Sequence, residues 1–472
     1  MIEVRADYLI IGSGAVGLAF ADTLLEQSDA RIAIVDRHAK PGGHWNDAYP
    51  FVALHQPSAF YGVASLPLGS GRIDASGPNA GYLELASGTE VSAYFEQVMQ
   101  QRLLPSGRVS YHPLSDYHDN GDGTGRIRSC VNGGETTAIV SRKTVDATYY
   151  GTTVPSTHTP KFRIGEGVRV IAPNALPHVF EREAEQPERF VVLGAGKTAM
   201  DVIVWLLRSG ADADAIHWVC PRDSWLLNRH TTQPGGEFFD QTIGGQLAIM
   251  DALAQASDVD ELFLQLERAG VMLRIDPAVR PAMFHYATIA QGEVDLLRTV
   301  RNVVRLGRVS AIYSAGMTLG GGIVPVAGRA LYIDCTASAV ERRPAIPQFN
   351  GRRITLQMIR MPQPAFSAAL TAFLEANFDD DATKNALGMT VPLPDGVEEY
   401  PAASRVNLLN QGAWSQNAAV RAWIHDCRLD GFGRMIASVR PDEPEKIAMI
   451  KRIGTSAMAA IGNIPKLMSA VT

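Results

Sequence analysis

Two glycine-rich segments of the chain have the spacing that suits phosphate binding. The first directly follows the apolar stretch 8–11 and comprises Gly12, Ser13, Gly14, Ala15, Val16 and Gly17. In such a loop the first glycine makes a tight turn, the second admits a pyrophosphate close to the backbone, and the third lets helix and strand pack closely. The start of the following helix directs backbone N–H groups at the phosphates. We therefore predict that these six residues bind a dinucleotide.

An acidic residue completes this first unit. The second apolar run, residues 31–35, ends at Asp36, and Arg37 follows it. A carboxylate at the end of this strand is placed to accept a hydrogen bond from a ribose hydroxyl. The alternative is a glycine-rich turn in an ordinary α/β unit, but the combination of strand, loop, helix and acid argues against it. We predict that Asp36 and Arg37 belong to the same binding site.

A second unit of the same kind opens at residue 189. The strand pattern 189–193 precedes a second loop, in which we predict that Gly194, Gly196, Lys197 and Thr198 contact a second dinucleotide. The next strand, 216–220, leads to Arg222, where the first unit has Asp36. A guanidinium suits a 2′-phosphate and a carboxylate repels it, so this exchange favours NADPH over NADH. The alternatives are a nucleotide fold that has lost its ligand and, for Arg222, a solvated surface arginine.

Composition limits the partners and the cellular compartment. The chain has 472 residues, a net charge of −6 and four cysteines at positions 130, 220, 335 and 427. This charge gives no reason to expect binding to nucleic acid, and no basic block or long apolar run suggests a membrane. No C-x-x-C pair or closely spaced histidines suggest a metal site or a redox-active disulfide. Four isolated cysteines are typical of reduced thiols, and the first residues show no signal-peptide pattern, so we expect a cytoplasmic protein.

The order of these patterns predicts an α/β protein with two Rossmann-like domains and a helical C-terminal tail. We expect a first domain at 1–160 and 331–472, with C-terminal helices at 401–472, interrupted by a second domain at 161–330. The stretch 330–338 is interpreted as the strand that returns to the first domain. Helical periodicity is expected at 293–306, and at 443–468 with breaks at its glycines and proline. The terminal helices also offer a surface for an oligomer.

These residues resemble the class B flavoprotein monooxygenases: the flavin-containing, Baeyer–Villiger and N-hydroxylating enzymes. Four segments carry the resemblance: residues 12–17 with Asp36, the G-G-x-W loop at 42–45, the second loop within 191–201, and the arginine-containing stretch 221–225. The resemblance implies FAD in the first domain, NADPH in the inserted domain, molecular oxygen, and a small-molecule substrate. It also implies that Gly43, His44 and Trp45 lie along the FAD, with Trp45 as a packing residue.

Two departures from the family pattern narrow the expected chemistry. The Baeyer–Villiger fingerprint is missing from residues 158–165, where its histidine and tryptophan do not follow in register. The two A-T-G segments of the family occur at 147–149 and 336–338 without their glycines. We therefore expect a divergent member that favours N- or S-oxygenation. The alternatives are an NAD(P)H-dependent flavoprotein reductase without oxygen transfer and a non-catalytic flavin-binding protein.

Three residues are candidates for catalysis. Gln56 stands where the family often has an asparagine after the G-G-x-W loop, and its amide can donate in the same way. His55 can donate a hydrogen bond or move a proton near neutral pH. Arg229 follows Trp225 in a segment that could fold over the nicotinamide and pair with an anion. For Gln56 and His55 the alternative is a loop side chain that hydrogen-bonds to neighbouring backbone, and for Arg229 it is a surface ion pair.

Overall fold

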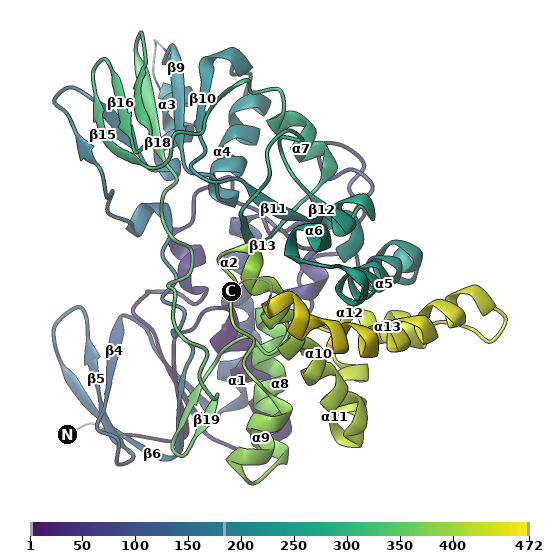
Figure 1. Ribbon diagram of the computed structural model, residues 1–472. Coiled ribbons are helices and arrows are strands. Elements are labelled where there is room, and N and C mark those ends of the chain that lie inside the picture. Colours follow the sequence, from purple (N-terminus) through teal and green to yellow (C-terminus); the bar gives the residue numbers. More distant parts are fainter. Residues whose placement is uncertain (1–2, 183–185, 470–472) are drawn as a thin grey trace.

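Each glycine-rich loop follows the central strand of a parallel sheet. The computed structural model describes residues 3–182 and 186–469, and Figure 1 shows the two sheets in separate lobes. In the first sheet, β1 (Glu3–Ile11) lies between its parallel neighbours β2 (Ile32–Val35) and β6 (Glu135–Asp146). The buried, continuously apolar β2 is typical of a parallel strand with both faces covered.

The first sheet is extended on both sides and covered on both faces. Its order is β19-β20-β6-β1-β2-β3, with β4 and β5 joined to β6 as an antiparallel meander. Helices α1 (Ala15–Gln27) and α8 (Pro364–Asn377) pack together on one face. The added strands are β3 (Val109–His112), β4 (Ser115–Asp119), β5 (Thr124–Ser129), β19 (Phe349–Asn350) and β20 (Arg353–Thr355).

The second sheet repeats this plan. All neighbours in its order β14-β10-β9-β18-β8 are parallel, and β9 (Arg189–Leu193) is central. The other four strands are β8 (Arg169–Ile171), β10 (Ile216–Val219), β14 (Asn302–Val304) and β18 (Ala330–Asp334). One face is covered by α3 (Leu176–Arg182), α4 (Lys197–Arg208) and α7 (Gln291–Leu297). The other is covered by a small sheet of β7 (Arg163–Ile164), β15 (Val309–Tyr313), β16 (Gly316–Leu319) and β17 (Gly322–Pro325).

One predicted domain boundary was wrong. The stretch 330–338 was expected to return to the first domain, but β18 lies between β9 and β8 in the second sheet. The chain rejoins the first sheet only at β19. An apolar strand of five residues looks the same in either sheet, because both sheets bury their parallel strands on two faces. The position of residue 331 relative to the boundary therefore could not be read from the local pattern.

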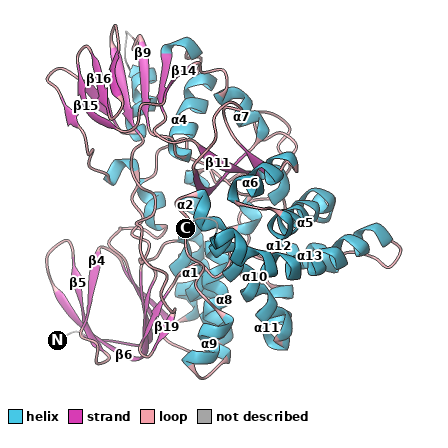
Figure 2. Cartoon of the chain, viewed as in Figure 1, coloured by secondary structure: helices cyan, strands magenta, loops and turns pink. Residues whose placement is uncertain are grey.

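A third cluster of elements joins the lobes on one side (Figures 1 and 2). It contains a short sheet of β11 (Ser224–Asn228), β12 (Met272–Leu273) and β13 (Met283–Ile289). Helices α5 (Phe239–Gln255) and α6 (Val259–Arg268) complete it, and the last helix, α13 (Pro444–Ser469), packs along α5. Residues 401–472 were predicted to belong wholly to the first domain, and for α13 this was wrong because its buried residues share a core with α5 and α6.

Two of the predicted helices differ from the structure, and five further helices complete the fold of the described residues. They are α2 (Gly88–Gln97), α9 (Asp381–Leu387), α10 (Tyr400–Gln416), α11 (Ala418–Asp426) and α12 (Gly431–Ala437). The helix expected at 293–306 ends at Leu297 and gives way to β14. Helix α13 continues through Gly454, Gly462 and Pro465 without a break. Among the described residues, none of the helices combines the length and the apolarity that a membrane span requires.

Candidate functional site

The first glycine loop joins β1 to α1 in the conformation that its sequence predicts. Gly12 has a φ of +100°, which favours glycine. A Cβ at Gly17 would lie 2.0 Å from the carbonyl oxygen of Gly12, so no side chain fits between helix and turn. Gly14 is the N-cap of α1 and provides no side-chain cap. The first N–H groups of Ala15, Val16 and the following turn are therefore left for another acceptor.

Asp36 lies beside this loop and is almost fully buried. One carboxylate oxygen accepts hydrogen bonds from the backbone N–H of Ser13 at 2.5 Å and from its hydroxyl at 2.8 Å. The other accepts from the backbone N–H of His38 at 2.7 Å. Ser13 thus holds Asp36 against the glycine loop, with its own side chain buried. Arg37 points into solvent and pairs with Asp116. The predicted contacts of these residues with a cofactor stay predictions.

The G-G-x-W loop packs directly against the first glycine loop. The N–H of Gly42 donates to the carbonyl of Ser13 at 2.9 Å, and a Cβ at Gly43 would lie 3.0 Å from the Cα of Gly14. Trp45 donates its indole N–H to the Tyr61 hydroxyl at 2.7 Å and stacks on His44. Burial lowers the pKa of His44 to about 4, so this imidazole is neutral at pH 7. Trp45 therefore packs against His44 and Tyr61 within the protein, and its predicted contact with FAD stays a prediction.

The second loop is more open than the first. Gly194 has a φ of +122°, and a Cβ there would lie 2.6 Å from the carbonyl oxygen of Cys335. A Cβ at Gly196 would meet no atom within 4 Å. Gly196 is the N-cap of α4, again without a side-chain cap. Serine, aspartate or asparagine side chains cap α2, α6, α9, α11 and α12, whereas α5, α8 and α10 also lack a side-chain cap but have no glycine at that position.

Lys197, the first residue of α4, does not face solvent but enters a buried network of charges. Its ammonium pairs with Asp201 one turn along the helix and with Glu293 of α7 at 3.0 Å. Glu293 also pairs with Arg229 at 2.7 Å and accepts the backbone N–H of Ala290 at 2.9 Å. Arg229 is only 1% exposed, so the surface ion pair considered for it is excluded.

Residues of the first domain complete this network. Asp201 accepts a hydrogen bond from the Tyr49 hydroxyl at 2.7 Å, and His55 Nε2 lies 3.3 Å from the same oxygen. Arg229 donates its Nε–H to the His55 carbonyl at 2.9 Å. Thr198, the second residue of α4, lies beside the Tyr49 hydroxyl. The network therefore ties the loop 49–55 to two helices of the second domain.

The charges in this network fix its protonation. Burial alone would raise the pKa of Glu293, but Lys197 and Arg229 outweigh it and lower that pKa to about 2. Asp201 is affected in the same way: burial is opposed chiefly by Lys197, and its pKa falls well below the ordinary value. Burial, with help from Lys197, lowers the pKa of His55. At neutral pH both carboxylates are ionised and His55 is neutral.

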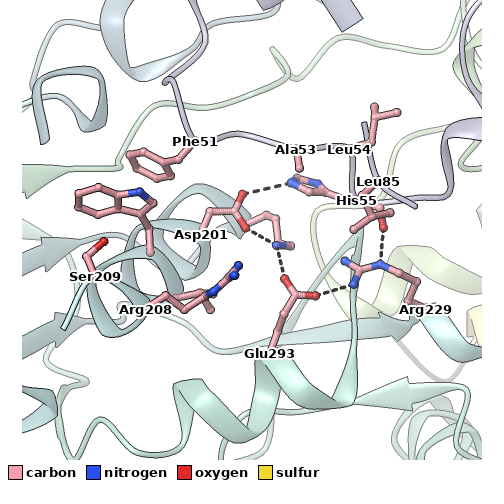
Figure 3. A pocket seen from close by; sticks show the side chains of 13 residues that line it. Phe51, Ala53, Leu54, His55, Leu85, Asp201, Arg208, Ser209, Arg229 and Glu293 are labelled. Atoms are coloured by element: carbon pink, nitrogen blue, oxygen red, sulfur yellow. Dashed lines mark hydrogen bonds and ion pairs between the residues drawn. The ribbon is translucent and has the colours of Figure 1, made fainter. Parts of the chain in front are cut away.

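A pocket of about 370 Å³ opens beside the network (Figure 3). Its lining contains His55, Lys197, Asp201, Arg229 and Glu293 together with Phe51, Ala53, Leu54, Leu85, Val204, Trp205, Arg208 and Ser209. Figure 3 shows Phe51 and Arg208 toward one end, and His55 and Arg229 toward the other. The pocket thus lies between the loop 51–55 of the first domain and the side of α4.

Gln56 is directed away from this pocket. Its amide nitrogen lies 3.4 Å from the carbonyl of Pro362, next to the N-terminus of α8. The neighbouring Gln363 is the N-cap of α8, and its side-chain oxygen is buried with no hydrogen-bond partner among the described residues. A buried amide oxygen without a donor is costly, which makes this place a candidate for a ligand that donates a hydrogen bond.

Arg222 also lies apart from the pocket. It follows β10, as predicted, and is 46% exposed with a loose contact of 3.8 Å to Asp395. The same carboxylate accepts from His285 at 2.8 Å. A guanidinium held this loosely has room to change partners, and its prediction as a 2′-phosphate ligand stays a prediction.

Among the sequence-predicted residues, His55, Lys197 and Arg229 come together, while Gln56 and Arg222 do not join them. Sequence reasoning missed Asp201, Glu293 and Tyr49. Asp201 had one usable signal, since it stands four residues after Lys197 and so shares its helix face. Tyr49 and Glu293 meet their partners only in three dimensions. Among residues 3–182 and 186–469, no three His, Cys, Asp or Glu side chains are grouped as metal ligands.

The chain is similar along its length to two mycobacterial proteins. It is 43% identical over 473 residues to the uncharacterized protein Rv2000 of Mycobacterium tuberculosis, which covers 99% of this chain and 86% of the relative. The same values hold for the uncharacterized protein Mb2023 of Mycobacterium bovis. Residues 10–60 match the family described as NAD(P)-binding Rossmann-like domain.

Solved structures of monooxygenases have a similar fold. Polycyclic ketone monooxygenase from Thermothelomyces thermophila superposes with a TM-score of 0.52 at 14% identity, covering 98% of this chain and 88% of that one. S-allyl-L-cysteine S-oxygenase from Allium sativum covers 99% of both chains with a TM-score of 0.45 at 12% identity. The first match establishes a shared fold. The predicted α/β fold with two Rossmann-like domains is thereby confirmed.

Proposed function

The chain belongs to the same family as these mycobacterial proteins, and from this premise we propose that it is an FAD- and NADPH-dependent oxidoreductase that oxygenates a small organic molecule. The observation that carries the proposal is the repeated pair of glycine-capped helices. Both α1 and α4 have a glycine as N-cap, lack a side-chain cap, and follow the central strand of a parallel sheet. This is the arrangement in which a helix N-terminus binds a dinucleotide pyrophosphate.

FAD fits the first unit. Gly12, Gly14 and Gly17 leave the backbone bare where a pyrophosphate would approach, and Ser13 holds the Asp36 carboxylate beside this loop, where it would accept from a ribose hydroxyl. Gly43, His44 and Trp45 pack against this loop and would border the same cofactor. Gln56 and the unpartnered oxygen of Gln363 offer hydrogen-bonding groups at the start of α8 for the polar edge of a flavin ring.

NADPH fits the second unit. Open space over Gly196 and the free N–H groups of Lys197 and Thr198 suit a pyrophosphate. Arg222, loosely held after β10, is the candidate partner of the 2′-phosphate. Bound NADPH would supply a hydride, and bound FAD the electrons with which molecular oxygen is activated. The protein would bind both groups, orient the substrate and exclude water.

His55 and Arg229 are the proposed residues of the reaction site. His55 is neutral and is oriented by Asp201, so it can accept a hydrogen bond or a proton from the substrate. Arg229 is ion-paired with Glu293 at the end of the pocket, where its guanidinium would stabilise negative charge that develops during oxygenation. We favour N- or S-oxygenation, since the Baeyer–Villiger fingerprint is absent.

The four free cysteines support a reducing, cytoplasmic location.

Purified protein tests the proposal directly. We expect yellow protein that oxidises NADPH, and incorporation of ¹⁸O from labelled oxygen into an organic acceptor. Oxidation of NADPH with release of hydrogen peroxide for every acceptor would instead indicate a reductase. Protein that stays colourless after incubation with FAD would contradict the cofactor assignment itself.

The choice between NADPH and NADH has its own test. We expect Arg222→Ala to reduce the preference for NADPH by roughly tenfold, the worth of one charge-assisted contact with phosphate. The ratio of kcat/KM for NADPH and NADH measures it. Arg342→Ala is the matched control, because Arg342 is an exposed arginine that contacts the same Asp395 carboxylate. An unchanged ratio in Arg222→Ala would dismiss the role.

A further inference from the structure

The pocket beside α4 has an apolar wall suited to a flat or elongated ligand. Phe51 and Trp205 stack with ring centroids 5.0 Å apart and an interplanar angle of 24°. Leu54, Leu85 and Val204 extend the apolar lining. A wall of this kind, with a few polar groups at fixed places, is typical of a small-molecule site.

One end of the pocket presents a hydrogen-bond acceptor. His55 Nε2 faces the ionised Asp201 carboxylate at 3.3 Å, which favours the tautomer with its proton on Nε2. Nδ1 then carries a lone pair, has no partner among the described residues, and is not enclosed, since the side chain is 35% exposed. Lys197, Arg229, Glu293 and Tyr49 surround the pair but are satisfied within the network. His55 Nδ1 is therefore available to a ligand.

The other end presents a positive charge. Arg208 lies seven residues after Asp201 on α4, so their Cα atoms are about 10 Å apart along one side of the helix. Arg208 is exposed and has no ion pair among the described residues. The pocket's three cations, Lys197, Arg208 and Arg229, exceed its two carboxylates, Asp201 and Glu293, by one charge. Because the others are paired with each other, this excess is carried by Arg208 and favours an anion there.

We propose that this pocket holds the substrate, and that the substrate is an elongated, preferably aromatic carboxylate with a neutral amine at the end remote from its anionic group. The carboxylate pairs with Arg208, the apolar body lies along Phe51 and Trp205, and the amine donates an N–H to His55 Nδ1. This hydrogen bond fixes the direction of the nitrogen lone pair. Asp201 is a positioning residue, since it acts on the substrate through His55. The assignment deepens the proposed function and rests on it for the reaction, but binding can be measured without turnover.

The first experiment measures binding by calorimetry with 4-(4-aminophenyl)butyrate and its uncharged amide, 4-(4-aminophenyl)butyramide. Protein as purified, with its cofactor, is used. We expect Arg208→Ala to weaken binding of the carboxylate by roughly tenfold and to leave the amide unaffected, because one charge-assisted pair is lost. Arg222→Ala is the control and should affect neither compound. Equal loss for both compounds, or no loss, would overturn the proposal.

The second experiment isolates the amine. We expect 4-(4-aminophenyl)butyrate to bind roughly three- to tenfold more tightly than 4-phenylbutyrate at pH 8, as one added hydrogen bond provides. This advantage should disappear in His55→Asn and should decline as pH falls through the titration of His55, because protonated Nδ1 can no longer accept. Asp201→Asn should shift that decline, whereas a purely structural role would not. An advantage that is independent of His55 would contradict the assignment.

Competition separates this site from the nucleotide site. We expect NADP⁺ to leave the affinity for 4-(4-aminophenyl)butyrate unchanged. Displacement of the probe by NADP⁺ would assign the pocket to the cofactor and overturn the proposal. Failure of the probe to bind, in protein that oxidises NADPH, would refute the substrate class while leaving the proposed function intact. Binding of the probe by a protein that cannot bind flavin would support the substrate class and refute the proposed function.

Discussion

The two Rossmann-like units share one plan, yet they differ in how closed their glycine loops are. In the first unit Gly17 contacts the turn so closely that no Cβ fits, and Ser13 and Asp36 hold each other in a buried pair. In the second unit alanine stands in the third glycine position as Ala199, and the space over Gly196 is open. The same fold therefore provides one enclosed loop and one accessible loop. This difference suits a cofactor that remains bound and a second that must come and go.

The strand beside each central strand ends in the same turn. After β6, Asp146 accepts hydrogen bonds from the backbone N–H and hydroxyl of Thr148 at 2.9 and 2.7 Å. After β18, Asp334 does the same for Thr336 at 2.9 and 2.6 Å. These turns lie where the family has its A-T-G segments, and the threonine keeps the turn although the glycine is missing. The two units therefore differ in their glycine loops, whereas the strands and turns beside these loops are alike.

The largest effect should come from closing the tight loop further. Gly17→Ala places a methyl group 2.0 Å from a carbonyl oxygen, so helix α1 must move away from the turn. We expect a loss of several kcal/mol, enough to prevent folding of the first unit or binding of flavin. Yield of soluble yellow protein and urea unfolding measure it. A variant that is stable and binds a full equivalent of flavin would show that the first loop is not closed as described.

The next largest loss of stability should come from breaking the buried charge network that joins the two units. Asp201→Ala leaves the buried Lys197 with one carboxylate and removes the anchor of Tyr49 and His55. Breaking a buried ion pair of this kind costs about 3–5 kcal/mol. Urea unfolding should register this loss, and Arg5→Ala, which removes an exposed ion pair, should change stability by less than about 0.5 kcal/mol. Equal effects of the two changes would contradict the role of the network.

The stability that this charge network provides should decrease at low pH. Glu293 has a pKa of about 2 in the folded protein, below its ordinary value of 4.5. The ionised form is therefore the one that stabilises the fold, and its contribution is complete above pH 4.5 and declines as pH falls toward 2. We expect Glu293→Gln to be less stable at pH 7 and to lose less stability across this window. Parallel pH profiles of the two proteins, from thermal unfolding, would exclude the effect.

A substitution in the second glycine loop should weaken NADPH binding with little effect on stability. Gly196→Ala adds a methyl group that meets no protein atom, at a backbone conformation open to any residue. We expect stability to change by less than about 0.5 kcal/mol, while NADPH binds roughly tenfold more weakly because the methyl group lies in the path of the pyrophosphate. Fluorescence titration with NADPH measures the second effect. Unchanged affinity would place the pyrophosphate elsewhere.

The smallest effect tests the third glycine position of the second unit. Ala199→Gly should destabilise the protein by about 1 kcal/mol, since a buried helical alanine loses its methyl group and gains backbone freedom. Urea unfolding would detect it. A gain in stability would indicate that α4 is held too far from its strand by Ala199, as α1 would be by a side chain at position 17.

Local sequence was enough to predict the parts of the fold that depend on local rules. The glycine loops, the apolar strands before them and the helices α1 and α4 that follow them were predicted from turn geometry and spacing. The sheet to which β18 belongs could not be predicted, because strand pairing joins residues that are distant along the chain. The helix expected at 293–306 failed for a related reason: pairing with β10 turns residues 302–304 into a strand.

The candidate site was predicted in part for the same reasons. Glycines with special backbone conformations and the residue after a strand can be located from spacing alone, which identified residues 12–17, Asp36 and the second loop. The partners of Lys197 could not all be located, since Glu293 lies on another helix and Tyr49 in another domain. The prediction that Arg229 matters came from its neighbourhood in sequence. Its burial against Glu293 became apparent only in three dimensions.

Helix α13, the last helix of the chain, completes a core that belongs mostly to α5 and α6. It follows a largely exposed connection at 438–443, in which Val439 is half-buried, and contributes Ala460, Ile464 and Leu467 to a core shared with α5. In effect the chain carries its own peptide ligand, held at a high effective concentration by a short tether. A protease that cuts the tether would leave a nicked protein whose last segment stays in place, and a synthetic peptide of 444–469 could then exchange with it.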